Sequence, residues 1–194
     1  MDENAREVAG RVMQVCWVIL VFYWVVAAAS TKATARKMSR GWRLCYLFSV
    51  LVAMYLVTFS HRLPYPLDEV VIPRGESEGI VAMLLCVAGL VFAVWARVTL
   101  GSNWSGSVTL KVDHELVQSG PYALVRHPIY TGILAMVAAT SAYNGTLGSI
   151  AGFVILTASF WVKLGHEEAL MTAQFPGQYP AYVARVRRLI PFLL

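Results

Sequence analysis

The residues best suited to chemistry lie in one polar stretch, 113–132, which reads DHELVQSGPYALVRHPIYTG. It contains histidines, tyrosines, an arginine and a glutamate, so it can donate and accept hydrogen bonds and stack on rings. A second polar group follows further along the chain, where Lys163 precedes the pair Glu167 and Glu168. The residues between the two groups are almost entirely apolar. We therefore expect the two groups to build one site.

These residue types suit a ligand that carries charges of both signs and an aromatic ring. A helix that begins at Pro128 would offer backbone N–H groups and the positive end of its dipole to a carboxylate. Glu167 would attract an ammonium or a sulfonium, and Tyr122 and Tyr130 offer ring faces to an adenine or a cation. S-adenosylmethionine contains all of these groups, although a nucleotide would satisfy many of them. The chain has no G-x-G-x-x-G motif after a strand, which argues against a Rossmann-type site.

The elements that must position these residues are predicted to be membrane-spanning helices. The sequence is 58% hydrophobic and 14% charged, whereas a soluble domain has about 25% charged residues. Charge-free runs occupy 12–31, 44–60, 79–96 and 128–162. A hydrocarbon core of roughly 30 Å needs about 20 helical residues, so each of the first three runs predicts one span. The length of 194 residues predicts a single membrane domain.

The fourth run is too long for one span and contains the turn signal Tyr-Asn-Gly at 143–145. It therefore predicts two short antiparallel helices, 128–142 and 147–162, that form a hairpin. Because the open ends of a hairpin meet, His127 before the first helix should lie close to Glu167 after the second. The polar groups far apart in the sequence would then converge on one pocket.

The predicted fold is all-α, with five transmembrane helices and a cofactor pocket formed by the 100–132 linker and the C-terminal segment. The loop before residue 44 is basic, whereas the loop 61–78 has more acidic than basic residues. By the positive-inside rule, the first loop is cytoplasmic. The N-terminus is then expected outside, and the pocket and the C-terminus in the cytoplasm. The net charge of +5 is thereby explained by membrane loops, and no nucleic acid is expected as a partner.

The sequence also predicts the local structure of three other segments. The prolines of 63–67 exclude a regular helix and predict an external loop or a cap over the bundle. Residues 108–117 alternate weakly, which suits a short extended segment or a plain loop equally. The apolar residues of 179–190 follow helical spacing. This segment is predicted to be amphipathic and to lie on the membrane surface, with the arginines of 185–188 facing lipid.

The polar motifs resemble the isoprenylcysteine carboxyl methyltransferase family of integral membrane enzymes. The resemblance covers about residues 100–194, and the first hundred residues share only hydropathy with the family. It rests on HELVQSGPY at 114–122, RHPIYTG at 126–132, the pair Glu167-Glu168, FPGQYPAY at 175–182 and the late Pro191. The spacing G-x-Y-x-x-x-R-H-P-x-Y-x-G is specific for the wider superfamily and less specific for the substrate.

The resemblance implies S-adenosylmethionine as the cofactor, no metal, and a role for each matched residue. Glu167 would bind the cofactor's ammonium or orient the reacting centre. Lys163, four residues earlier, would hold the carboxylate of the substrate, and these two are the expected catalytic residues. The implied cofactor-binding residues are His114, Glu115, Leu116, Val117, Gln118, Gly120, Tyr122, Arg126, His127, Pro128, Ile129, Tyr130 and Glu168.

The implied reaction is methyl transfer from S-adenosylmethionine to the C-terminal α-carboxylate of a prenylated cysteine, as in a protein-S-isoprenylcysteine O-methyltransferase. The lipophilic, prenylcysteine-type substrate would enter sideways from the surrounding membrane lipid. Three alternatives stay open. They are methyl transfer to a phospholipid amine or another small lipophilic acceptor, a NADPH-dependent membrane sterol-type reductase, and a helical membrane protein without catalysis.

Overall fold

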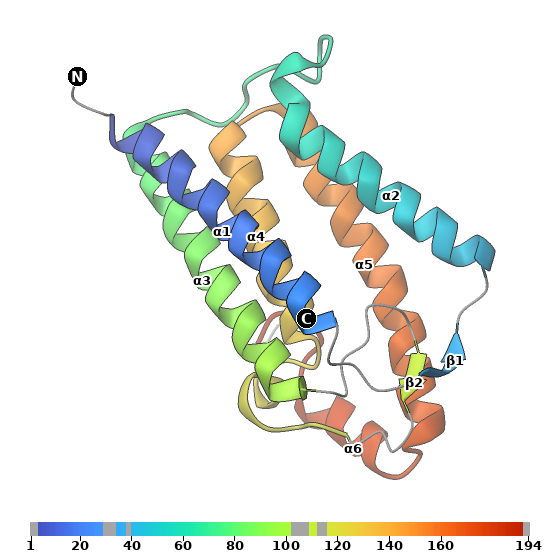
Figure 1. Ribbon diagram of the computed structural model, residues 1–194. Coiled ribbons are helices and arrows are strands. Elements are labelled where there is room, and N and C mark those ends of the chain that lie inside the picture. Colours follow the sequence, from blue (N-terminus) through green and yellow to red (C-terminus); the bar gives the residue numbers. More distant parts are fainter. Residues whose placement is uncertain (1–3, 29–33, 38–39, 102–108, 112–115, 192–194) are drawn as a thin grey trace.

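A computed structural model shows the chain as a bundle of long helices (Figure 1) and describes residues 4–28, 34–37, 40–101, 109–111 and 116–191. In chain order the elements are α1 (Ala5–Ala28), β1 (Thr34–Lys37), α2 (Arg40–Phe59), η1 (Ser60–Arg62), α3 (Glu76–Leu100), β2 (Thr109–Lys111), η3 (Gly120–Ala123), α4 (Pro128–Asn144), α5 (Leu147–Gln174) and α6 (Gln178–Arg185). Within the described residues, four helices are long and apolar enough to cross a membrane, namely α1, α2, α3 and α5. α4, with 17 residues, is slightly shorter.

The outer faces of these helices are apolar. On α1, the exposed fractions of Val18, Phe22 and Val25 are 67%, 70% and 68%, and that of Phe48 on α2 is 69%. Apolar surface of this extent is unfavourable in water and is expected where a helix faces lipid. The prediction of a helical, multi-pass integral membrane protein is therefore confirmed.

One departure from an all-α fold is a small antiparallel pair of strands. β1 and β2 pair with Thr34 opposite Lys111 and Lys37 opposite Thr109. Of the two possibilities left open for 108–117, residues 109–111 are thus extended, whereas the described residues 116 and 117 form no strand. The pair joins the connection between α1 and α2 to the connection that follows α3.

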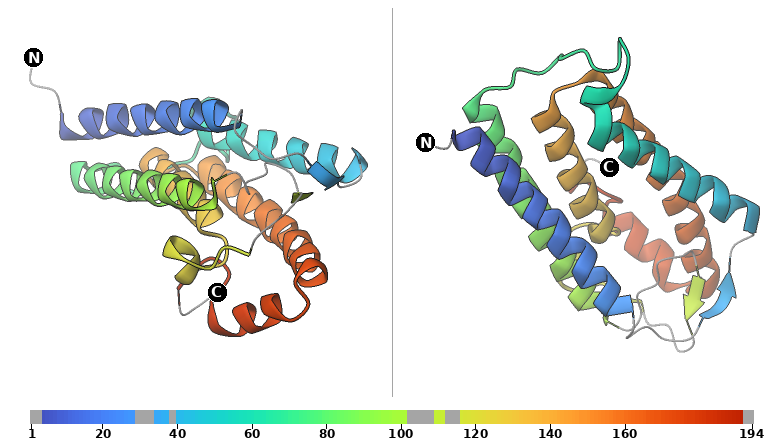
Figure 2. Two further views of the ribbon diagram at one scale, coloured as in Figure 1. Left: turned by 60° about the horizontal axis from the view of Figure 1, so that its bottom comes forward. Right: turned by 45° about the horizontal axis from the view of Figure 1, so that its top comes forward.

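α4 holds the two halves of the bundle together. Its Met136 is fully buried in a cluster with residues of α1 and α3. The next residue, Val137, is fully buried in a second cluster with residues of α2 and α5. Successive helical residues point in different directions, so α4 can pack against both pairs at once. Two further views show α4 between α3 and α5 (Figure 2).

The start of α4 is held very close to α3. A Cβ built on Gly132 would lie 2.5 Å from the carbonyl oxygen of Gly89, and one on Gly89 would lie 2.7 Å from that of Gly132. Any side chain here would separate the helices, which is why small residues are common at membrane helix crossings. This contact fixes the position of the polar stretch along the bundle, at the lower end in Figure 1.

The opposite end of the bundle is closed by the loop 63–75, which we call the cap loop. Its backbone crosses the turn between α4 and α5, where Val71 N and Ile72 N donate to Gly145 O at 2.8 and 3.0 Å. In return, Leu147 N donates to Glu69 O at 2.9 Å. The segment 63–67 is not helical, as its prolines predicted. These bonds pair backbone groups of the cap loop and of the α4–α5 turn where the two pack together.

The C-terminal segment differs from its prediction. The helix α6 ends at Arg185, and residues 186–191, here called the C-terminal extension, continue without helix. The extension lies beside the polar stretch, where Arg126 N donates to Arg187 O at 2.8 Å and His127 N donates to Arg188 O at 3.1 Å. The expectation that Arg188 faces lipid is wrong, because these backbone bonds turn it toward the bundle.

Candidate active site

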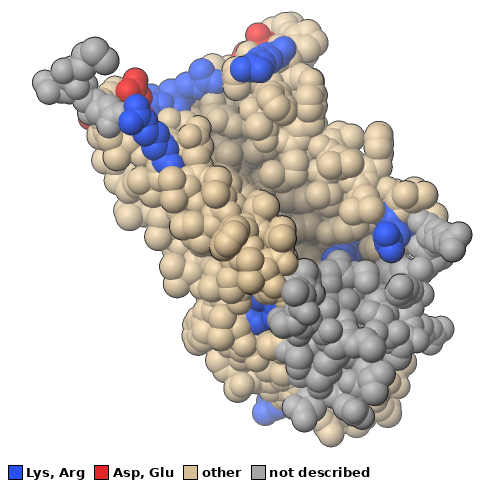
Figure 3. Space-filling model, viewed as in Figure 1, with Lys and Arg blue, Asp and Glu red and all other residues tan. Residues whose placement is uncertain are grey.

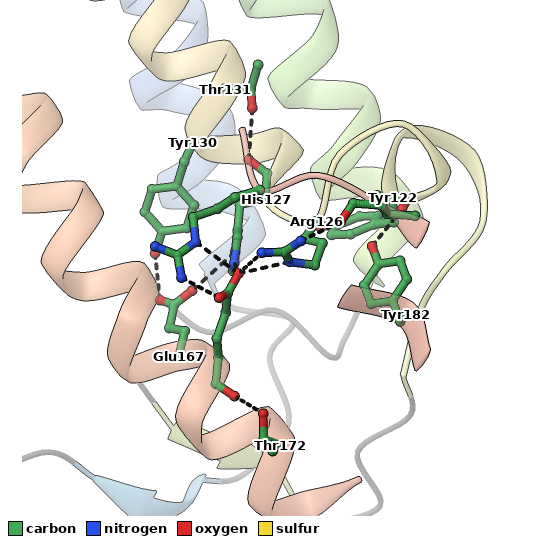
Figure 4. Close-up of polar contacts among 11 residues, drawn as sticks. Tyr122, Arg126, His127, Tyr130, Thr131, Glu167, Thr172 and Tyr182 are labelled. Atoms are coloured by element: carbon green, nitrogen blue, oxygen red, sulfur yellow. Dashed lines mark hydrogen bonds and ion pairs between the residues drawn. The ribbon is translucent and has the colours of Figure 1, made fainter. Parts of the chain in front are cut away.

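The start of α4 and the end of α5 bring five polar side chains together, namely His127, Tyr130, Lys163, Glu167 and Glu168. Figure 4 shows His127, Tyr130 and Glu167 pointing toward one another. The most direct link between the helices runs from the Tyr130 hydroxyl, which donates to Glu167 Oε1 at 2.6 Å. Polar groups at this depth of a membrane protein are costly unless they pair or serve a cavity. Their convergence marks this region as the candidate active site.

Glu167 keeps one carboxylate oxygen available. Its Oε1 accepts from Tyr130 and lies 3.7 Å from Lys163 Nζ. Its Oε2 lies 3.8 Å from His127 Nδ1, which is too long for a hydrogen bond. The side chain is 20% exposed. Within the described residues Oε2 therefore accepts no hydrogen bond, and it can receive a cationic donor from a ligand.

Lys163 is unusually buried for a lysine. The residue is 5% exposed, and its Nζ lies 4.9 Å from the ring centre of Tyr46 and 5.1 Å from that of Tyr130. The faces of two aromatic rings favour an ammonium between them. Tyr46 is not among the residues predicted from the sequence, because nothing there distinguishes it from the other aromatic residues of the membrane helices.

Glu168 sits in a different environment from its neighbour. Its Oε1 accepts from Arg126 Nε at 2.9 Å and from Arg188 Nε at 3.2 Å. His127 Nε2 lies 3.0 Å from the same oxygen, and Arg188 Nη2 pairs with Oε2. Arg126 also donates to the carbonyl of Val186. Glu168 is thus the centre of an ion cluster that joins α5, the start of α4 and the C-terminal extension.

The cluster has more positive than negative charge. Arg126, Lys163 and Arg188 supply three cations, whereas Glu167 and Glu168 supply two anions, so one positive charge is in excess when His127 is neutral. A buried net charge favours a ligand of opposite sign. The excess suits the binding of an anionic group such as a carboxylate.

Three of the predicted cofactor-binding residues have buried side chains. Tyr122 and Ile129 are buried in one cluster with Ala96, and Pro128 is fully buried. Tyr122 O accepts from the hydroxyl of Tyr182 at 2.6 Å. Burial raises the pKa of Tyr122 above its ordinary value and that of Tyr182 to about 12. Both hydroxyls are therefore neutral donors at physiological pH.

The remaining predicted residues lie before η3 or at its first position. Gln118 Oε1 accepts from Arg185 Nη2 at 3.1 Å, and Val117 packs against the cluster around Tyr122. Leu116 is partly buried, and Gly120 has a φ of 59°, which suits glycine. His114 and Glu115 lie outside the described residues. Among the residues that the structure does describe, no group of three or more His, Cys, Asp or Glu side chains could hold a metal ion.

Arg188 should matter for the position of the C-terminal extension. We expect Arg188→Gln to release the extension, because it removes the ion pair with Glu168 and the contact of the guanidinium with the Trp161 ring, 4.5 Å from its centroid. Hydrogen exchange of a peptide containing the Arg126 and His127 amides should then rise about tenfold, which corresponds to roughly 1.4 kcal/mol. Arg185→Gln is the matched control, since its bonds are exposed. Equal exchange in both variants would show that Arg188 does not anchor the extension.

The region that holds the candidate active site also matches a known protein family. Residues 81–173 match the Isoprenylcysteine carboxyl methyltransferase (ICMT) family. The resemblance found in the sequence is thereby confirmed. The ICMT match includes most of α3, all of α4 and most of α5, and therefore the polar stretch, Lys163, Glu167 and Glu168. It does not include Tyr46 or Arg188.

Curated relatives agree with the ICMT match. A "Probable protein-S-isoprenylcysteine O-methyltransferase" of Oryza sativa subsp. indica is 27% identical over 116 residues, which are 58% of this chain and 61% of the rice protein. The "Protein-S-isoprenylcysteine O-methyltransferase" of Schizosaccharomyces pombe is 34% identical over 101 residues, 50% of this chain and 43% of the yeast protein. The chain thus matches about three fifths of the length of the rice relative and less than half of the yeast one.

The fold also resembles a solved structure. The match is to the eukaryotic intramembrane Ras methyltransferase ICMT without a monobody, with a TM-score of 0.53 and 23% sequence identity. It covers 82% of this chain and 55% of the solved chain. At this identity the likeness establishes an ICMT-like fold. The share of the chain that it covers is larger than the segment 81–173 that matches the family.

Proposed function

We propose that the protein is a methyltransferase that moves a methyl group from S-adenosylmethionine to the C-terminal carboxylate of a prenylated cysteine. The observation that supports this most is the convergence of Tyr130, Lys163 and Glu167 at the ends of α4 and α5. These residues lie within the region that matches the ICMT family. The names of the curated relatives support the same acceptor.

The residues present fit the methionine end of this cofactor. Glu167 Oε2 accepts no hydrogen bond from a described residue and can receive the ammonium. α4 begins after His127 without a side-chain cap, and Thr131 N already donates to His127 O, so the N–H groups of Ile129 and Tyr130 can donate to the cofactor's carboxylate. When bound, S-adenosylmethionine supplies an electrophilic methyl group on a sulfonium. The adenosine end would extend toward Leu116 and Gln118.

The acceptor carboxylate would be held by Lys163. A carboxylate is ionised at neutral pH, so the protein needs no strong base to activate it. The task of the residues is to align the carboxylate oxygen and to exclude water from it. Lys163 is placed for this by the rings of Tyr46 and Tyr130, which favour its charged form. Arg126, Glu168 and Arg188 hold the start of α4 in position and touch neither ligand.

The topology that we propose has five spans. The four longest apolar helices cross the membrane, and α4 crosses as the shorter partner of α5, to which Gly145 and Thr146 join it. Five spans leave the N-terminus and the cap loop outside, and the candidate active site in the cytoplasm. The basic loop between α1 and α2 supports this orientation. A soluble cofactor would then arrive from the cytoplasm and a prenyl chain from the bilayer.

An acceptor panel tests the proposed function. Purified protein is incubated with methyl-labelled S-adenosylmethionine and either an N-acylated S-prenylcysteine, the same amino acid without the prenyl chain, or phosphatidylethanolamine. We expect label only in the prenylated acid, as an ester that mild base hydrolyses to volatile methanol. Base-stable label in the phospholipid would instead establish N-methylation. No transfer together with no binding of S-adenosylhomocysteine would reject the methyltransferase assignment.

A further inference from the structure

A second polar cavity lies at the opposite end of the bundle from the candidate active site. It has a volume of about 250 Å³ and is lined by Arg6, His61, Arg74, Tyr143 and Asn144. This is many times the roughly 10–15 Å³ that one water molecule needs. The lining comes from the start of α1, from η1, from the cap loop and from the end of α4. Two of the five side chains are permanent cations, and none is a carboxylate.

Arg74 is held so that most of its guanidinium can still bind a ligand. Its Nε donates to Asn144 O at 2.8 Å. Asn144 is fixed in turn, since its Nδ2 donates to Val57 O at 2.6 Å. Within the described part of the chain, the two terminal nitrogens of Arg74 make no hydrogen bond. Four N–H groups of a positioned guanidinium therefore remain available at the cavity.

Arg6 is positioned by a second set of contacts. Its Nη1 donates to Gly75 O at 3.3 Å and its Nη2 donates to Tyr143 O. Its guanidinium carbon lies 4.2 Å from the ring centroid of Tyr143. His61 is exposed, and its ring makes no hydrogen bond to a described residue. The cavity thus combines two oriented guanidinium groups with an imidazole that can also donate.

Within the described residues, these cations are not held in close ion pairs. Among the described residues, neither Arg6 nor Arg74 forms an ion pair with a carboxylate within 4.0 Å. Glu78, in the first turn of α3, accepts from the hydroxyl of Ser77 at 2.9 Å, and its carboxylate interacts electrostatically with Arg6 at longer range. In Figure 3 basic side chains (blue) lie at this end of the molecule together with some acidic ones (red), above flanks with few charges. An anion is the ligand that such a cavity would favour.

We propose that this cavity binds the phosphate group of an anionic phospholipid. Guanidinium groups match the oxygens of a phosphate through paired, charge-assisted hydrogen bonds. The cavity lies where apolar helices end, which is the level of lipid headgroups. Exposed apolar side chains neighbour its cations in the sequence, with Val8 near Arg6 and Val70 and Val71 near Arg74. They would contact the glycerol and the acyl chains, which a free phosphate lacks.

The bound lipid would tie three elements together. Arg6 belongs to α1, Arg74 to the cap loop, and both already contact the end of α4. A phosphate between the two guanidinium groups would offset their mutual repulsion. Occupancy should therefore raise the thermal stability of the bundle.

Lipid titration of the full-length protein in a neutral detergent tests the proposal, with native mass spectrometry and thermal unfolding as readouts. We expect saturable binding of phosphatidylglycerol with a rise in Tm, and at least tenfold weaker binding of phosphatidylcholine. Arg74→Gln should weaken phosphatidylglycerol binding about tenfold or more, and Arg74→Lys less. Arg62→Gln is the matched control, because Arg62 lies on the neighbouring η1 and contacts the Phe59 ring but does not line the cavity. It should bind as the unaltered protein does.

Three results would overturn the proposal. The first is equal binding of the two lipids by the unaltered protein, a measurement that does not depend on whether a variant folds. The second is equal weakening by Arg74→Gln and Arg62→Gln. The third is saturable binding of inorganic phosphate that displaces nothing and leaves phosphatidylglycerol unbound, which would assign the cavity to a soluble phosphate.

Discussion

Glu167→Gln is expected to reduce kcat/KM for methyl transfer by about 10- to 100-fold. The variant keeps the size of the side chain and removes the negative charge that would receive the cofactor's ammonium. A hydrogen bond to a charged group contributes about 1.5–3 kcal/mol, and each 1.4 kcal/mol is tenfold. The affinity for S-adenosylhomocysteine, which retains the ammonium, should fall by a similar factor. Calorimetry and a labelled-methyl assay measure the two effects separately.

The matched control for this experiment is Glu69→Gln. Glu69 lies in the cap loop at the other end of the bundle and contributes its backbone carbonyl to Leu147 N, a bond that the substitution leaves intact. Its activity should equal that of the unaltered protein. Unchanged binding of S-adenosylhomocysteine in Glu167→Gln would remove Glu167 from the cofactor and leave it only the bond to Tyr130.

The sequence predicted the helical membrane fold well because its signals are local. Charge-free runs such as 79–96 identify a buried or lipid-facing helix without reference to the rest of the chain. The prolines of 63–67 likewise exclude a helix through their own geometry. The bond pattern of the cap loop could not be predicted, because it depends on which carbonyl of the α4–α5 turn lies opposite each amide.

The polar site was predicted in composition but not in the division of roles. Glu167 and Glu168 are adjacent and chemically identical, and only the structure shows that one keeps an available oxygen while the other is bonded to Arg126 and Arg188. The position of Arg188 depends on tertiary backbone bonds to the polar stretch. Its place in a cluster of arginines could equally suggest a membrane-facing surface.

The contact of Tyr46 with Lys163 could not be predicted from the sequence either. Tyr46 contacts Lys163 across the packing of α2 against α5, and it lies outside the region that matches the ICMT family. Neither a motif nor helical periodicity could pair the two residues. Contacts between helices far apart in the sequence need the structure, particularly where both partners look like ordinary membrane-helix residues.

Glu168→Gln is expected to affect stability more than any chemical step. The carboxylate compensates Arg126 and Arg188, whose side chains are 8% and 19% exposed. Removing one partner of a buried ion cluster costs about 3–5 kcal/mol, because the remaining charges lose their compensation. For a chain of this size that corresponds to a fall in Tm of roughly 10 °C. Thermal unfolding in one detergent, compared with Glu167→Gln, measures the difference between the two neighbours.

A double variant distinguishes a stability role from direct ligand binding. If Glu168 acts by compensating charge, Glu168→Gln combined with Arg188→Gln should lose less stability than the sum of the two single variants, because the second change removes a cation that the first left unpaired. The cofactor affinity of folded Glu168→Gln should stay close to that of the unaltered protein at low temperature. A stable Glu168→Gln protein that no longer binds S-adenosylhomocysteine would place Glu168 on the ligand, and the two glutamates would then share the task assigned to Glu167.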